Sequence, residues 1–421
     1  MSFYYEQNNL FGERVDLGRL AKTVGTPCFV YSTAKILEQW EAYETAFRGR
    51  KHLVCYAVKA NDNLSLLTLL KESGAGYDIV SVGELNRVLA IGGEMGKVVF
   101  SGVGKTQAEI EEAVCREVGC INVESEPELQ RIGRACAESG RKAQIAFRVN
   151  PNVDARTHPY ISTGLRESKF GVSIESAVPL YRKAISLGLK PVGIACHVGS
   201  QITSLEPIVE SVKNVVELAK SLSVEGIDIK HIDVGGGLGI QYQNEMVPSI
   251  SSLVQQICDV VPAQFEIRME PGRSMVGSSG VLLAKVEYLK KTPSRNFVII
   301  DAAMNDFLRP AFYDAWHRVV PCRIRDDRDA IRCDVVGPVC ETGDWLALDR
   351  TLSVQEGDYL CICDAGAYGA VMSSNYNSRL KAAEVLIDGE TYRTIRSRET
   401  VEEMLANESQ WLFPSKNCND N

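Results

Sequence analysis

The chain has 421 residues, of which 45% are hydrophobic and 24% charged, and its formal net charge is −8. This length exceeds the size at which one hydrophobic core usually stops growing, so we expect two domains. The acidic balance argues against nucleic-acid binding, which needs a basic surface.

No apolar run reaches the length of a membrane span, and residues 1–10 lack the basic and then apolar order of a secretion signal. We therefore expect a cytoplasmic protein with no membrane contact. The thirteen cysteines are scattered and include no CxxC pair. This pattern predicts small buried thiols in a reducing compartment, with no zinc site.

The first two-thirds of the chain alternates short strand-like runs with amphipathic helical patterns. The predicted strands are Leu53–Ala60, Gly76–Ser81, Val98–Gly102, Cys120–Glu124, Ala143–Asn150, Val192–Val198, His231–Gly236 and Phe265–Glu270. The helical patterns include Glu84–Ile91, Gln107–Arg116, Pro127–Glu138 and Ile208–Leu222. An α/β alternation repeated eight times predicts a (β/α)8 TIM barrel.

The pattern changes after Gly280. The strand-like runs are then Val281–Leu289, Phe297–Asp301, Cys333–Val336, Tyr359–Asp364 and Ala383–Ile387, with one helix predicted over Asp306–Trp316. This predicts a C-terminal β-sandwich or β-barrel domain. We expect an N-terminal segment (residues 1–32) that joins this domain, a barrel over residues 33–279, and the β domain over residues 280–421.

Lys59 ends the first predicted barrel strand, within Tyr-Ala-Val-Lys-Ala-Asn (residues 56–61). The working groups of barrel enzymes lie at the C-terminal ends of the strands. An unpaired ammonium is costly to bury, and a lysine that carries an aldehyde cofactor as a Schiff base avoids that cost. A solvated loop lysine is the alternative, and for Lys59 alone both interpretations stay open.

Polar and glycine-rich segments follow the sixth, seventh and eighth predicted strands, at His197–Ser200, Gly235–Gly237 and Glu270–Arg273. Glycines after a strand let backbone amides approach a phosphate, although tight turns explain many such runs. A carboxylate such as Glu270 can keep the ring nitrogen of a pyridine cofactor protonated, so that the ring accepts electrons. A salt bridge between Glu270 and Arg273 is the structural alternative.

Together these motifs resemble the diaminopimelate decarboxylase family, whose members use pyridoxal 5'-phosphate on an alanine-racemase-like barrel. The resemblance runs from residues 56–61 to Ser-Asn-Tyr-Asn-Ser-Arg at residues 374–379. It implies the decarboxylation of meso-2,6-diaminopimelate to L-lysine and carbon dioxide, the last step of lysine biosynthesis, without a metal.

The resemblance also implies roles for residues of the barrel and of the tyrosine segment Asp-Ala-Gly-Ala-Tyr-Gly (residues 364–369). Lys59 is the catalytic lysine that binds the cofactor, and His197 packs against its ring. Glu270 faces the pyridine nitrogen, and Tyr368 reaches cofactor and substrate. The residues that hold the phosphate are Ser200, Gly235, Gly236, Gly237, Gly272 and Arg273.

The segment Val-Gly-Pro-Val-Cys-Glu-Thr-Gly-Asp (residues 336–344) resembles the cysteine–glutamate loop of the same family. By this resemblance Cys340 returns a proton after carbon dioxide leaves, and Glu341 contacts the distal amino group of the substrate. In the family this loop completes the active site of the partner subunit, which implies a homodimer with shared sites. By itself, Cys340 would be interpreted as a buried apolar residue.

Substrate choice depends on Arg309, within Asp-Ala-Ala-Met-Asn-Asp-Phe-Leu-Arg-Pro-Ala-Phe-Tyr (residues 301–313). Arginine offers a rigid bidentate fork to a carboxylate. The resemblance implies that Arg273, Arg309 and Tyr313 hold the distal carboxylate of the substrate. Ornithine has no such group.

Three other functions remain open. One is a related decarboxylase that acts on carboxynorspermidine, ornithine or an antibiotic-pathway substrate. Another is a racemase, which needs a second base opposite Lys59. The third is a cofactor-free regulator, which has no need to retain Lys59, Cys340, Glu341 and Tyr368.

Overall fold

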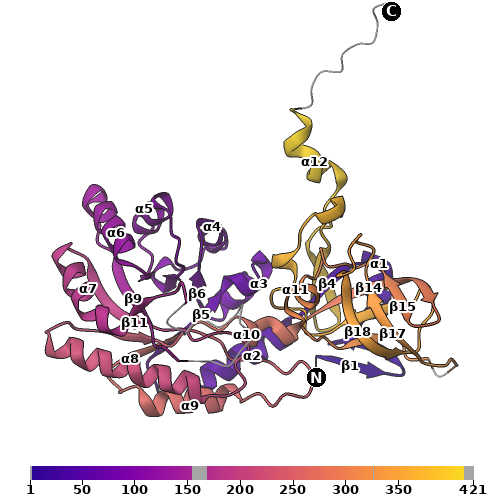
Figure 1. The fold of residues 1–421 in the computed structure, drawn as a ribbon, viewed down its shortest axis with the longest axis horizontal. Coiled ribbons are helices and arrows are strands. Elements are labelled where there is room, and N and C mark those ends of the chain that lie inside the picture. Colours follow the sequence, from indigo (N-terminus) through magenta and orange to yellow (C-terminus); the bar gives the residue numbers. More distant parts are fainter. Residues whose placement is uncertain (1, 154–167, 326, 412–421) are drawn as a thin grey trace, which may run out of the picture.

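The computed structural model describes residues 2–153, 168–325 and 327–411. Figure 1 shows a barrel and an all-β region side by side. The barrel strands are β5 (His52–Ala57), β6 (Gly76–Ile79), β7 (Val98–Phe100), β8 (Cys120–Val123), β9 (Gln144–Asn150), β11 (Lys190–Ala195), β12 (His231–Asp233) and β13 (Glu266–Met269). Each is parallel to the next, and β13 pairs with β5, which closes the barrel. The predicted TIM barrel is confirmed.

Helices cover the outside of this barrel (Figure 1). They are α2 (Thr33–Ala46), α3 (Leu64–Glu72), α4 (Val82–Ala90), α5 (Gln107–Cys115), α6 (Glu126–Ser139), α7 (Ile174–Ser186), α8 (Glu206–Val224) and α9 (Ile250–Val260), with the short α10 (Arg273–Val276) after β13. Several of these helices begin directly after a polar N-cap residue that follows a barrel strand. The side chains of Ser81, Thr106 and Ser125 each accept a hydrogen bond from the backbone N–H three residues later.

The all-β region contains most of the remaining elements. They are β4 (Cys28–Ser32), β14 (Gly280–Lys291), β15 (Asn296–Ile300), α11 (Arg309–Tyr313), β16 (Val319–Pro321), β17 (Ile331–Val336), β18 (Trp345–Leu352), β19 (Tyr359–Ile362), β20 (Ala383–Asp388) and β21 (Thr391–Arg396). These strands form a mixed sheet in the order β18-β17-β15-β14-β4-β20-β21. Strand β19 also pairs with β14, and β16 pairs with β19. The predicted β domain is confirmed.

The N-terminal segment adds a strand to this sheet. Strand β4 runs antiparallel to β14 and parallel to β20, so it joins two strands that are more than 90 positions apart in the chain. Before it come a small sheet of β1 (Phe3–Glu6), β2 (Asn9–Gly12) and β3 (Val15–Asp16), and helix α1 (Leu17–Val24). The domain limits at residues 32 and 280 stay predictions.

Several predicted elements have other bounds in the structure, and two of these differences bear on the site. The helix expected over Asp306–Trp316 is only Arg309–Tyr313, because Pro310 confines the helix start and Asp314 adopts a left-handed conformation with φ 50°. The first barrel strand ends at Ala57, and Val58–Ala60 form a single 3-10 turn. Lys59 therefore lies just beyond the strand, on the turn that leads into the next helix.

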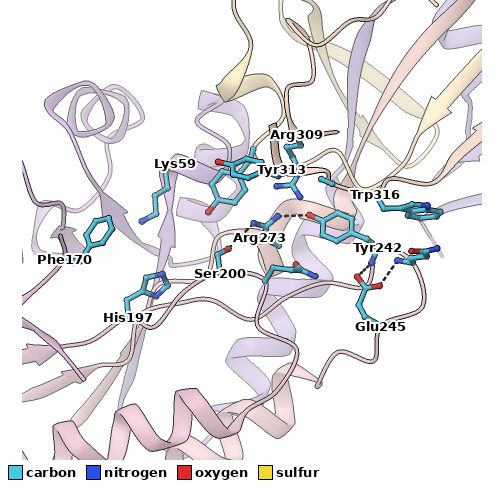
Figure 2. A pocket seen from close by; sticks show the side chains of 14 residues that line it. Lys59, Phe170, His197, Ser200, Tyr242, Glu245, Arg273, Arg309, Tyr313 and Trp316 are labelled. Atoms are coloured by element: carbon cyan, nitrogen blue, oxygen red, sulfur yellow. Dashed lines mark hydrogen bonds between the residues drawn. The ribbon is translucent and has the colours of Figure 1, made fainter. Parts of the chain in front are cut away.

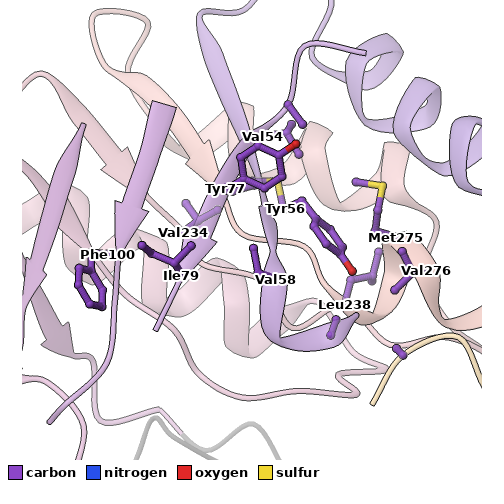
Figure 3. Packing of buried hydrophobic residues seen from close by; sticks show 14 of the residues in the cluster. Val54, Tyr56, Val58, Tyr77, Ile79, Phe100, Val234, Leu238, Met275 and Val276 are labelled. Atoms are coloured by element: carbon purple, nitrogen blue, oxygen red, sulfur yellow. The ribbon is translucent and has the colours of Figure 1, made fainter. Parts of the chain in front are cut away.

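Aromatic and branched side chains fill the layer between the barrel strands and the helices around them (Figure 3). Tyr56, Tyr77 and Phe100, from three adjacent strands, are at most 1% exposed. The hydroxyls of Tyr56 and Tyr77 donate to the backbone oxygens of Asn61 and Leu67, at 2.9 and 2.6 Å. These large side chains thus remain hydrogen-bonded inside the core. None of the described helices combines the length and apolar character that crossing a membrane requires.

Candidate active site

A cavity of about 450 Å³ opens between the C-terminal ends of the barrel strands and the β domain (Figure 2). It is lined by Lys59, Phe170, His197, Ser200, Gln201, Tyr242, Gln243, Glu245, Arg273, Arg309, Tyr313, Ala315, Trp316 and Tyr368. Seven of the predicted site residues are in this lining. The cavity is therefore the candidate active site.

Lys59 reaches into the cavity from the turn after β5 (Figure 2). Its Nζ donates to Oδ2 of Asp78, on β6, at 2.5 Å, and the Asp78 side chain is fully buried. Burial lowers the pKa of Lys59, but the negative charges of Asp78 and Glu270 outweigh it and raise the pKa above its usual value. Lys59 is thus a charged amine held against a buried carboxylate.

Glu270 directly follows β13 and lies among polar groups from neighbouring strands. Ser101 Oγ and Asn122 Nδ2 donate to its Oε1 at 3.3 and 3.5 Å. Burial, followed by the charges of Asp233 and Asp78, raises the pKa of Glu270 well above its usual range. Three acidic groups thus share one buried region with a single lysine. Burial and the neighbouring negative charges therefore both favour the neutral form of Glu270.

The three glycines after β12 pass close to the loops that follow β11 and β13. Gly235 and Gly237 have φ angles of +67° and +109°. A Cβ atom on Gly236 would lie 2.2 Å from the backbone oxygen of Glu270, and one on Gly237 would lie 2.4 Å from that of Gly199. Only glycine fits this packing, which brings backbone amides to the strand ends where barrels commonly bind phosphate.

His197 lies beside these glycines and lines the cavity. Its Nδ1 accepts a hydrogen bond from the backbone N–H of Gly236 at 3.3 Å. Burial, and then the positive charges of Arg148 and Lys59, hold the pKa of His197 well below its usual value. The imidazole is therefore a neutral, flat surface at the edge of the cavity.

Arg273 begins α10 and is only 5% exposed. Its Nη1 donates to Tyr242 Oη at 2.8 Å and its Nη2 to Ser200 Oγ at 3.0 Å (Figure 2). The ring of Tyr368 lies 5.0 Å from the guanidinium carbon. The structure thus joins three predicted residues in one cluster, and it places the Ser200 hydroxyl on the Arg273 side chain.

Tyr368 enters the cavity from the β domain. Its φ is +56°, and its backbone N–H donates to the backbone oxygen of Ala60 at 2.8 Å, one residue beyond Lys59. A Cβ atom on Gly272 would lie 3.0 Å from Ala60 Cβ and 3.5 Å from Tyr368 Oη. The two domains therefore meet closely beside Lys59.

Arg309 is the first residue of α11 and is 6% exposed. Its guanidinium carbon lies 5.3 and 6.0 Å from the ring centres of Tyr242 and Tyr313. None of the described carboxylates forms an ion pair with Arg309 or Arg273 at 4.0 Å or less. Two buried positive charges next to a cavity, without a counter-ion in the described part of the chain, form a site for an anion such as a carboxylate.

Cys340 and Glu341 lie outside this cavity, on the exposed loop between β17 and β18. The backbone N–H of Cys340 donates to Asn377 Oδ1 at 3.2 Å, and the Glu341 carboxylate accepts a hydrogen bond from the Tyr376 hydroxyl. The loop is anchored by Asp344, which accepts from two backbone N–H groups. The structure does not bring these two residues to Lys59 within one chain.

Seven residues of the cavity lining were missed by the sequence analysis, among them Tyr242, as were two residues that contact predicted ones from behind the lining, Asp78 and His317. An aspartate within the apolar strand β6 was a signal for Asp78, because a buried carboxylate needs a partner. Tyr242 lies in a loop after β12, and no local pattern marks it. His317 follows α11 closely, and its contact with Arg309 appears only in three dimensions.

Comparison with known proteins agrees with this geometry. A family model described as "Pyridoxal-dependent decarboxylase, pyridoxal binding domain" matches residues 33–277. Diaminopimelate decarboxylase of Pseudomonas aeruginosa is 52% identical over 97% of this chain and 99% of its own length. That of Vibrio cholerae is 50% identical over 96% and 98%.

Among solved structures, diaminopimelate decarboxylase from Helicobacter pylori complexed with L-lysine is 44% identical, with a TM-score of 0.91, over 94% of this chain and all of that one. The enzyme from M. jannaschii in complex with L-lysine has a TM-score of 0.91 at 37% identity, over 98% of both chains. The chain therefore belongs to the pyridoxal-dependent decarboxylase family, and pyridoxal phosphate is its cofactor.

Proposed function

We propose that this chain is a diaminopimelate decarboxylase, which converts meso-2,6-diaminopimelate to L-lysine and carbon dioxide. The observation that carries the proposal is the pair of buried arginines, Arg273 and Arg309, that line the same cavity as Lys59. A substrate with a second carboxylate supplies the charge that this pair lacks among the described residues. The names of the relatives that are about 50% identical over nearly the whole chain support the same substrate.

The residues at the cavity suit pyridoxal phosphate. Lys59 Nζ would bind its aldehyde, and the amides around Gly235–Gly237, where a side chain would collide with neighbouring backbone, would hold its phosphate with Ser200. His197 would pack on the ring. Glu270, whose pKa is raised by burial, would ionise next to a protonated ring nitrogen, since the added positive charge stabilises the carboxylate. When bound, the cofactor supplies the electron sink for decarboxylation.

Arg309 and Arg273 would seat the distal carboxylate of the substrate, together with Tyr313. This contact orients the substrate so that only one of its two amino-acid ends reaches Lys59. Ornithine and other diamino acids without the second carboxylate would leave both buried guanidiniums without an anion, which is costly. The arginine pair therefore favours diaminopimelate over such substrates.

Cys340 and Glu341 would act in the site of a second copy of the chain. Both are exposed and lie outside the cavity of their own chain, which supports a homodimer with shared sites. In that arrangement the Cys340 thiol would return a proton to the carbon that has lost carbon dioxide, and Glu341 would contact the distal amino group. Tyr368 would face both cofactor and substrate.

We also propose that the enzyme works in the cytoplasm. The twelve cysteines within the described residues are all free thiols. Free thiols in this number are typical of proteins from a reducing compartment.

The first experiment is to incubate the purified protein with pyridoxal phosphate and meso-diaminopimelate and to measure carbon dioxide and lysine. Ornithine, arginine and carboxynorspermidine serve as parallel substrates. Lysine from diaminopimelate alone is the expected result. Release from another substrate instead would overturn the assignment to the arginine pair, and no release from any would favour a cofactor-free regulator.

The shared site has its own test. Lys59→Ala and Cys340→Ala are each expected to be nearly inactive alone. Mixed under conditions that exchange subunits, they should recover about a quarter of the wild-type activity, because half of the dimers then have one intact site of two. Absence of any recovery after verified exchange would place both residues in the site of one chain.

A further inference from the structure

His317 lies next to the cavity, and the proposed function leaves it without a role. It is 0% exposed and follows α11, close to the start of β16. Its ring makes edge-to-face contacts with Phe307, at 4.7 Å between ring centres, and with Tyr242, at 5.0 Å. Packing on two sides therefore holds the imidazole plane in one orientation.

Both ring nitrogens of His317 have defined partners. Nδ1 lies 2.9 Å from the backbone oxygen of Cys363, and because a carbonyl only accepts, Nδ1 carries the hydrogen. Nε2 is then an acceptor, and Arg309 Nε donates to it at 3.3 Å. Burial, and then the charge of Arg309, lower the pKa of His317 to about 3. The ring is neutral at any ordinary working pH, so this tautomer persists.

The hydrogen bond to Nε2 uses only one edge of the Arg309 guanidinium. Within the described residues, no hydrogen bond joins Nη1 or Nη2 of Arg309 to a protein acceptor, and Arg309 lines the cavity (Figure 2). With Nε occupied, the two Nη groups form the remaining fork, which matches the two oxygens of a carboxylate. A long side chain that would otherwise sample several rotamers is thereby held in one of them.

We propose that His317 is a positioning residue, which orients the Nη1/Nη2 fork of Arg309 towards the carboxylate of the substrate and of the product amino acid. The inference rests on the proposed function, because it takes Arg309 as the carboxylate-binding group. His317 itself touches no reacting atom. Its loss should therefore weaken the binding of carboxylate ligands more than it slows the chemical step.

The test compares two ligands of the holoenzyme that differ in one group. L-lysine carries the carboxylate, whereas 1,5-diaminopentane has the same chain and amines without it. In wild type we expect L-lysine to bind more tightly. His317→Leu should weaken L-lysine binding, measured by calorimetry, about tenfold to a hundredfold, which is the usual effect of losing a buried hydrogen bond to a charged group. Binding of 1,5-diaminopentane should stay within about twofold.

Two further variants separate positioning from general damage. His317→Gln can accept from Arg309 and donate to the Cys363 oxygen, so it should restore most of the L-lysine affinity. His231→Gln replaces another buried histidine, 2% exposed, on β12 and should leave the ratio of the two affinities unchanged. Should His317→Leu fail to fold, His317→Asn, which is too short to span both partners, provides the same contrast.

For meso-diaminopimelate, the same defect should appear as a higher KM with kcat changed by less than about threefold. A folded His317→Leu or His317→Asn variant that keeps the wild-type preference for L-lysine, while Arg309→Ala loses it, would overturn the inference and leave the proposed function intact. A wild-type enzyme that does not distinguish the two ligands would instead contradict the proposed function itself.

Discussion

Replacing Asp78 by asparagine removes the charge that faces Lys59. Asp78 Oδ2 lies 2.5 Å from Lys59 Nζ, and the Asp78 side chain is fully buried. Burial acts to lower the pKa of Lys59, whereas Asp78 is the foremost group that raises it. In Asp78→Asn the amine loses that support, so its pKa should fall while the shape of the site is retained.

The size of the shift follows from the surroundings of the pair. Two unit charges about 4 Å apart attract by about 4 kcal/mol at the effective dielectric near a protein surface. The Lys59 side chain is 38% exposed, so solvent screens part of this attraction. Glu270 also remains to support the ammonium. We expect a loss of about 1.5–3 kcal/mol, which lowers the pKa of Lys59 by about one to two units.

The measurement is the rate at which the cofactor-free protein captures pyridoxal phosphate at different pH values. Samples are trapped with borohydride, and the label on the Lys59 peptide is quantified by mass spectrometry. Only the neutral amine attacks an aldehyde, so the midpoint of the rate profile reports the pKa of Lys59. In Asp78→Asn the midpoint should move about one to two pH units towards acid.

Asp334→Asn is the matched control, because Asp334 is also a buried aspartate in an ion pair, on β17 and with Arg295. Its profile should coincide with that of wild type. A folded Asp78→Asn protein with an unchanged midpoint would refute the electrostatic argument. The pKa of Lys59 would then depend on Glu270 and burial.

Three further predictions concern the partner loop, a buried ion pair and the buried histidine. Cys340→Ala should lower kcat sharply and leave the cofactor absorbance unchanged, and near-normal turnover would contradict the proton-donor role. Glu128→Gln should lower the free energy of unfolding, measured with denaturant, by about 3–5 kcal/mol, because the buried Lys105, 1% exposed, loses its counter-ion at 2.7 Å. Glu126→Gln, at an exposed ion pair on the same helix, should lower it by less than about 1 kcal/mol. Equal losses in the two variants would refute this. The depressed pKa of His317, about 3, gives stability that is present above the unfolded value of about 6.5 and is lost as pH falls. Between pH 6.5 and 5 the free energy of unfolding should fall by about 2 kcal/mol less in His317→Gln than in wild type. Parallel curves of unfolding free energy against pH would contradict this.

Much of the architecture could be predicted because its signals are local. The alternation of β-branched runs and amphipathic helices predicts the barrel, since each strand and helix buries a face that its own sequence defines. Capping residues such as Ser81 and Thr106 mark helix starts in the same way. The glycines at Gly235–Gly237 were found because close backbone approach excludes every other residue type.

Other features depend on which segments meet after folding. The segments around Lys59 and Arg309 marked both as site residues. The sequence did not predict that Asp78 pairs with the Lys59 amine or that His317 accepts a hydrogen bond from the Arg309 guanidinium. Such pairs join elements that are distant along the chain or lie in irregular loops. The helix at Arg309 was also predicted too long, because the left-handed Asp314 that ends it has no strong local signal.

The sequence by itself determined the barrel, the β domain and the reactive groups at the strand ends, because hydrophobic periodicity and glycine geometry are properties of single segments. Only the tertiary structure decided that strand β4 lies between β14 and β20, and that the cavity is lined by both domains. It also decided the charge states around Lys59 and Glu270, since a pKa depends on every charge and every desolvating contact nearby, whatever its position in the chain.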